Sequence, residues 1–138
     1  SLESFMHAEI DGERTLTELD FARLNKLSNG HWPVGLAAVG QFPDLVASAE
    51  IAPDVVTMYS QMEIVDLDSH YRHKLTLCYP RDAEPGIGFI SVLSPIGASL
   101  LGLRVGAVAR WQTPHGDACA AEVVAMLFQP EASGDYIT

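Results

Sequence analysis

The stretch that decides the fold is Ile90-Ser-Val-Leu-Ser-Pro-Ile-Gly-Ala-Ser-Leu-Leu-Gly-Leu-Arg-Val-Gly106. Its first residues complete an apolar segment, residues 87–93, with the length and composition of a β-strand. Ser94 and Pro95 then form a typical helix start, because a serine side chain caps free amides and proline tolerates the first helical turn. Gly102 is a natural terminus for that helix. The stretch therefore predicts a strand that leads directly into one short helix.

Four more segments have the pattern of strands and are separated by turn signals. They are residues 55–67, 71–79, 106–112 and 118–128, and the last two flank a hairpin turn at Thr113-Pro-His-Gly-Asp117. Strands on both sides of one short helix favour an α+β domain in which a mostly antiparallel sheet packs on that helix. We expect the polar tail, residues 129–138, to be extended.

Before residue 53 the pattern is helical instead. Thr17 resembles an N-cap, with Asp20 placed to satisfy free amide donors of the first turn. The apolar residues that follow lie roughly on one helical face: Leu16, Leu19, Leu24 and Leu27. Ser28-Asn29-Gly30 ends this helix, and a weaker second helix is predicted over residues 33–50, broken near Pro43. The sequence thus predicts a short helical hairpin, or truncated coiled coil, over residues 1–52 and a second domain over residues 53–138.

Composition limits the classes of function. The 138 residues are 48% hydrophobic, which is enough for a core, and the net charge is −10, with 18 acidic against 8 basic side chains. Because the basic residues are scattered, direct DNA or RNA binding is not expected. No apolar run approaches the ~20 residues that cross a bilayer, and the start, Ser1-Leu-Glu-Ser4, does not have the pattern of a secretory signal, so we expect a cytoplasmic protein without membrane contact. Cys78 and Cys119 are then expected to be buried and reduced.

The residues offer no convincing active site. His70 and His73 lie near Asp66 and Asp68, but this spacing suits a solvated hairpin better than a zinc site. The serines lack a nucleophile-elbow motif, and neither cysteine has an activating neighbour. Glycine-rich phosphate loops are absent as well. We therefore expect no catalytic residues, no metal and no cofactor.

The stretch from residue 90 to residue 106 closely resembles the C-terminal domain of the GreA/GreB transcription factors. That family reads I-S-V-x-S-P-I, then a short A-x-L-x-G helix and a V-G-D turn, whose acid is replaced here by Ala107. The Thr113 turn is similar to the family's T-P-G-G hairpin, with His115 at the first glycine. The similarity extends over residues 55–128. It implies an FKBP-like fold for this half of the chain.

The resemblance also implies a partner. Gre factors dock on bacterial RNA polymerase, at the rim that the largest subunit forms around the secondary channel. Mapped onto this sequence, the docking residues are Ser91, Ser94, Pro95, Ala98 and Leu101. Ser94 and Pro95 also serve as a helix start, and Leu101 has the character of a core residue.

Two further features resemble the Rnk subfamily, the regulators of nucleoside diphosphate kinase. They are Pro53-Asp-Val-Val-Thr-Met58 and the tail that begins at Gln129. Gre factors carry a long coiled coil with acids at its tip. The tip expected here contains Asn29, His31 and Trp32 and no acid. The resemblance therefore implies a polymerase-binding regulator that competes with Gre-type factors without stimulating transcript cleavage.

Two other functions stay open. A prolyl isomerase would need an aromatic-lined pocket, for which Phe89, Trp111 and Phe128 are candidates, although these side chains suit an ordinary core equally well. A binding module for a different protein could use Trp32 as its anchor.

Overall fold

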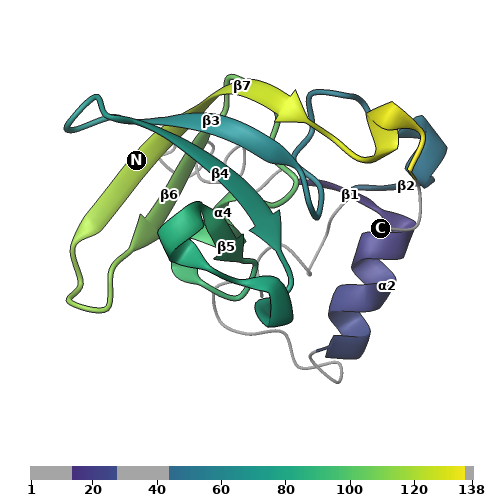
Figure 1. Cartoon of the computed structure of the whole chain (residues 1–138), viewed down its shortest axis with the longest axis horizontal. Coiled ribbons are helices and arrows are strands. Elements are labelled where there is room, and N and C mark those ends of the chain that lie inside the picture. Colours follow the sequence, from purple (N-terminus) through teal and green to yellow (C-terminus); the bar gives the residue numbers. More distant parts are fainter. Residues whose placement is uncertain (1–13, 28–43, 136–138) are drawn as a thin grey trace, which may run out of the picture.

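A five-stranded sheet forms most of the computed structural model, which describes residues 14–27 and 44–135. The strands lie in the order β5-β4-β3-β7-β6, and only β4 and β5 run parallel. Their bounds are β3 Gln61–Asp66, β4 Arg72–Cys78, β5 Phe89–Ser91, β6 Val108–Gln112 and β7 Ala118–Phe128. The sheet curls around helix α4, Pro95–Leu100, which contacts both edge strands (Figure 1). The expected α+β class with a mostly antiparallel sheet is confirmed.

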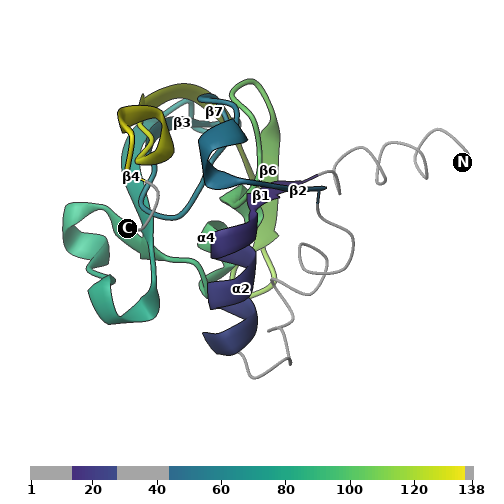
Figure 2. The same ribbon diagram turned by 90° about the vertical axis from the view of Figure 1, so that its right-hand side faces the viewer.

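The N-terminal part contributes a helix and a small second sheet. Strand β1, Thr15–Thr17, leads directly into helix α2, Glu18–Leu27, and pairs in parallel with β2, Asp44–Val46. Figures 1 and 2 both place α2 at one side of the curled sheet rather than within it. Four 3-10 turns complete the described chain: η1 Ser48–Glu50, η2 Pro80–Asp82, η3 Pro85–Ile87 and η4 Glu131–Ser133.

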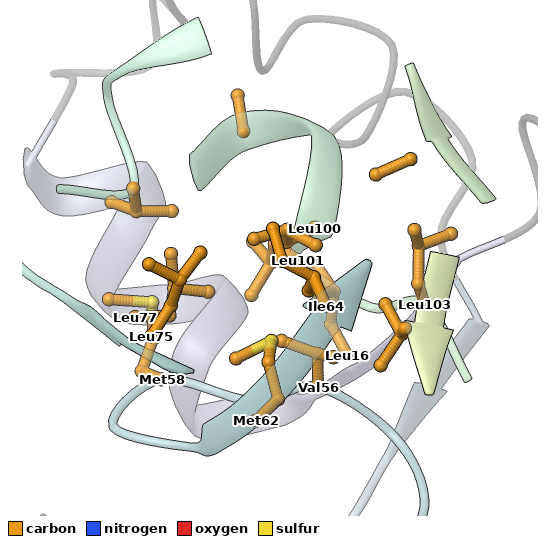
Figure 3. Packing of buried hydrophobic residues seen from close by; sticks show 14 of the residues in the cluster. Leu16, Val56, Met58, Met62, Ile64, Leu75, Leu77, Leu100, Leu101 and Leu103 are labelled. Carbon is orange, nitrogen blue, oxygen red and sulfur yellow. The ribbon is translucent and has the colours of Figure 1, made fainter. Parts of the chain in front are cut away.

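One hydrophobic core joins these parts. Met62 and Ile64 of β3, Leu100 of α4 and Leu103 pack together with Leu16 of β1 (Figure 3). Leu24 of α2 belongs to the same cluster and is only 1% exposed. Burying a leucine contributes about 1.5–3 kcal/mol, so α2 and β1 are held to the sheet by ordinary apolar packing.

The structure corrects two expectations about secondary structure. The second helix, predicted over residues 33–50, is absent from residues 44–50, where β2 and η1 stand instead; residues 33–43 lie outside the described chain. Pairing with β1, reinforced by the amide of Asp44 donating to the Arg14 carbonyl (2.9 Å), overrides a weak helical propensity. The tail is not extended throughout either, because Gly134 adopts φ 92° and closes η4.

Residues 52–60 form hydrogen bonds with both helix α2 and the C-terminal turn η4. Gln129 is 3% exposed, and its side-chain amide donates to the carbonyls of Ala52 (2.8 Å) and Val55 (2.7 Å). The hydroxyl of Thr57 donates to Glu131 Oε1 (2.7 Å) in the C-terminal turn. Residues 129–131 are therefore fixed against this segment.

Helix α2 is tied to the same segment through Asp20. The predicted N-cap is confirmed, since the amide of Asp20 donates to Thr17 Oγ1 (3.0 Å). The Asp20 carboxylate, however, turns into the core, where it is 2% exposed and accepts a hydrogen bond from the amide of Met58 (3.1 Å). Burial raises the pKa of Asp20 to about 7, and nearby Glu131 adds to the rise, while the Met58 and Thr17 bonds oppose it.

This buried carboxyl makes stability depend on pH. The folded-state pKa of about 7 lies above the ordinary 3.8, so the stability that neutral Asp20 contributes is complete below pH 3.8 and is lost as pH rises to about 7. Asp20→Asn keeps an oxygen acceptor but cannot ionise. We expect the free energy of unfolding of the variant to rise relative to that of the wild type as pH rises, by ~1.4 kcal/mol for each pKa unit of the shift. Chemical denaturation at pH 4 to 8 measures this difference.

Asp68→Asn provides the control, because it removes the same charge from an exposed position in the β3–β4 turn. Its stability difference from the wild type should vary little with pH. A constant difference between wild type and Asp20→Asn across the range would contradict the prediction.

Candidate partner-binding site

The candidate docking loop, residues 91–95, joins strand β5 to helix α4. Val92 is fully buried, and its amide donates to the Cys78 carbonyl (2.9 Å), which extends the β4–β5 pairing by one residue. The Ser91 carbonyl then accepts two bonds from Ser94, one from its amide (3.0 Å) and one from its hydroxyl (2.6 Å). The Ser94 hydroxyl oxygen in turn accepts the amide of Gly97 (3.1 Å), so Ser94 caps α4 as predicted.

Gly97 sets how closely α4 approaches this loop. A Cβ added at Gly97 would lie 2.0 Å from the Ser91 carbonyl oxygen, far inside any permitted contact. Only a residue without a side chain fits there. The loop is therefore held by side-chain and main-chain bonds at once and has a single well-defined shape.

The other end of α4 is held by the N-terminal part of the chain. Arg14 Nη1 donates to the carbonyls of Ser99 (3.0 Å) and Leu101 (2.8 Å), which are among the groups that a helix leaves unpaired at its C-terminus. The amide of Thr15 donates to the Gly102 carbonyl (3.2 Å). Gly102 has φ 82° and lies against Arg14 and Thr15, so it too must lack a side chain.

The five residues expected to dock separate into two groups. Pro95 is exposed, and Ser91 and Ser94 are half-buried. Ala98 and Leu101 are only 2% and 0% exposed and belong to the core. Their side chains lie inside the curled sheet and are not exposed on the surface of the described structure. The expected tip residues Asn29, His31 and Trp32 lie outside the described residues.

Leu93 is a further exposed residue of this loop and was not among the five residues expected to dock. It is 39% exposed between two half-buried serines, and its amide donates to Ser91 Oγ (3.1 Å). Since side chains alternate along an extended segment, a buried Val92 already implies an outward Leu93. That alternation is the signal that could have identified it.

Several residues that the sequence offered as possible metal-binding or nucleophilic groups lie in the described part of the chain. No three His, Cys, Asp or Glu side chains within residues 14–27 and 44–135 converge as metal ligands would. Asp66 instead accepts the amides of Ser69 (2.9 Å) and Asp68 (2.8 Å), and these bonds hold its pKa below the ordinary value. Burial raises the pKa of the Cys78 thiol, which disfavours the nucleophilic thiolate. Cys119 is half-buried rather than buried, and neither cysteine is in a disulfide.

The aromatic side chains considered for an isomerase pocket are not gathered in either of two hollows on the described part of the chain. Trp111 lines one of them, and Phe89 and Phe128 line neither. Phe128, near the end of β7, is 47% exposed.

Comparison with known proteins identifies the family. Residues 51–127, more than half of the chain, match the family model described as "Transcription elongation factor, GreA/GreB, C-term". The chain therefore belongs to the GreA/GreB family, which confirms the resemblance seen at residues 90–106.

Three relatives show how far the similarity extends. The regulator of nucleoside diphosphate kinase from Escherichia coli (strain K12) is 42% identical over 88 residues, 64% of this chain and 65% of that protein. The transcription elongation factor GreA from Solidesulfovibrio magneticus is 36% identical over 93 residues, 67% of this chain and 56% of that protein. The chain thus spans less than two thirds of either relative. A solved GreA/GreB structure from Nitrosomonas europaea has a TM-score of 0.69 and 32% identity, covering 84% of this chain and 98% of that one.

The close approach at Gly97 gives a direct test of the loop. Gly97→Ala forces a methyl group into the Ser91 carbonyl, and we expect it to lower the free energy of unfolding by about 2–4 kcal/mol. Gly86→Ala is the matched control, since a Cβ there meets nothing within 4 Å. It should change stability by less than ~0.5 kcal/mol. Thermal and chemical unfolding of both variants measure the difference, and equal stabilities would refute the packing argument.

Proposed function

We propose that this chain is a non-catalytic regulator that docks on bacterial RNA polymerase at the secondary-channel entrance and competes there with Gre-type factors. The observation that carries the proposal is the docking loop. It presents Leu93 and Pro95 outward on a fixed turn, within the segment that matches the family. A preformed loop loses little entropy on binding, which favours affinity.

The proposal excludes stimulation of transcript cleavage. Helix α2 has ten residues, which at ~1.5 Å per residue span roughly 15 Å. The sequence that follows it, Ser28-Asn-Gly-His-Trp32, contains no carboxylate with which to hold a metal ion. The relatives are named as a regulator and as elongation factors, which agrees with a regulatory role. We propose no catalytic residue, no metal and no cofactor.

We also infer a separate role for each of the two parts of the chain. Residues 53–138, with a curled sheet around one short helix, correspond to an FKBP-like docking domain, and residues 1–52 are a separate N-terminal part that includes helix α2. The polymerase partner implies the cytoplasm. Direct contact with DNA or RNA is not part of the proposal, because the net charge is −10. No helix in the described ranges, 14–27 and 44–135, has the length and apolar character to cross a membrane.

Competition on the polymerase tests the whole proposal. We expect saturating protein to displace a fluorescently labelled Gre factor from core RNA polymerase at equilibrium, and to suppress Gre-stimulated cleavage of a stalled transcript. The protein alone should not raise cleavage above the intrinsic rate. Failure to displace the labelled factor would contradict the proposal.

Leu93→Asp tests the docking loop itself. The variant places a charge in the expected contact without touching the core, and we expect it to bind polymerase at least about tenfold more weakly, a loss of ~1.4 kcal/mol or more. Leu67→Asp is the matched control, because Leu67 is similarly exposed, at 41% against 39%, but lies at the β3–β4 turn. An equal loss in both variants would show that the loop is not the specific contact.

A further inference from the structure

A second surface of the molecule, unrelated to the docking loop, is a groove of about 880 Å³ between helix α2 and the segment that follows β4. The described residues that line it are Arg23, Lys26, Leu27, Tyr59, Tyr79, Pro80, Arg81 and Asp82. No residue from 91 to 95 is among them. The groove is within the ~300–1,000 Å³ range that small-molecule sites occupy.

The charge of this groove is opposite to that of the protein. Three of the chain's eight basic residues line it beside a single carboxylate, although the net charge of the whole chain is −10. That carboxylate, Asp82, already accepts a hydrogen bond from the Tyr59 hydroxyl. It also lies 3.7 Å from Arg81 Nε. A local excess of positive charge in an acidic molecule concentrates small anions there.

The groove also offers aromatic and apolar surface. The rings of Tyr59 and Tyr79 lie 5.8 Å apart between centroids, and Leu27 is 45% exposed at the rim. Tyr59 reaches this position through a φ of 65°, a conformation that is costly for a bulky side chain and that clusters at functional sites. Flat ligand rings stack well on such tyrosines.

Tyr79 also forms part of the wall of the groove. The residue is largely buried, at 8% exposed, so its ring is a fixed part of the surface.

We propose that the groove binds a nucleotide-sized phosphate ester. The guanidinium and ammonium groups of Arg23, Lys26 and Arg81 take the phosphate oxygens, for which arginine forks are well matched. The ring portion of the ligand lies on Tyr59 and Leu27. This site is independent of polymerase docking, so failure of either proposal leaves the other standing.

Calorimetric titration of the full chain with ATP tests the site. Lys26→Gln combined with Arg81→Gln removes two charges from exposed side chains of the groove, and we expect ATP to bind roughly tenfold more weakly. Lys74→Gln combined with Arg104→Gln is the matched control, since it removes one lysine and one arginine from exposed positions outside the groove. The control should bind ATP within about twofold of the wild type.

Three results would overturn the proposal. The first is an absence of saturable ATP binding by the wild type. The second is an equal loss of affinity in the two double variants, which would mean general charge attraction. The third is adenosine binding as tightly as ATP, because the basic side chains would then have no part in recognition. Circular dichroism of both variants checks that they fold as the wild type does.

Discussion

Helix α4 meets strand β5 at a point where only a hydrogen atom fits between them, at Gly97 over the Ser91 carbonyl. This contact, with the two bonds that Ser94 donates to the same oxygen, fixes the angle at which the helix leaves the sheet. The helix then directs Leu101 into the curled sheet, while Leu93 is left outside. The exposure of Leu93 and the packing of the core are therefore set by the same turn.

The rest of the fold is assembled around residues 52–60, a segment that is mostly buried and rich in polar contacts. Asp20 reaches it from helix α2, and Gln129 and Glu131 reach it from the C-terminal turn. Buried polar networks of this kind contribute more to the uniqueness of a structure than to its stability. The burial of Asp20, which raises its pKa to about 7, shows that a charge at this junction is costly. The same hydrogen bonds fix helix α2 and residues 129–131 relative to this segment.

Much of this architecture follows from local pattern. The alternation of residues 118–128 and the turn at Thr113 predicted β6 and β7. The start of α4 was predicted from Ser94, because serine is a favoured N-cap residue. Contacts between residues that are distant in sequence could not be predicted in this way. Ala98 resembles a docking residue in the motif and is buried because the curled sheet closes over it. Residues 44–46 form a strand because β1 is available to pair with them, which no local propensity encodes. The exposure of Leu93 could have been predicted from the sequence, because side chains alternate along an extended segment.

The hydrogen bonds from Arg14 to Ser99 and Leu101 have a consequence for how such proteins can evolve. Arg14 completes the end of helix α4, more than eighty positions later in the chain. The N-terminal part of the chain is therefore not a module that recombination can exchange freely. A replacement without an equivalent arginine would leave the carbonyl groups of Ser99 and Leu101 without this partner, and one without Leu16 would leave a cavity in the core. A different N-terminal segment can be grafted onto this scaffold only when the graft begins after strand β1.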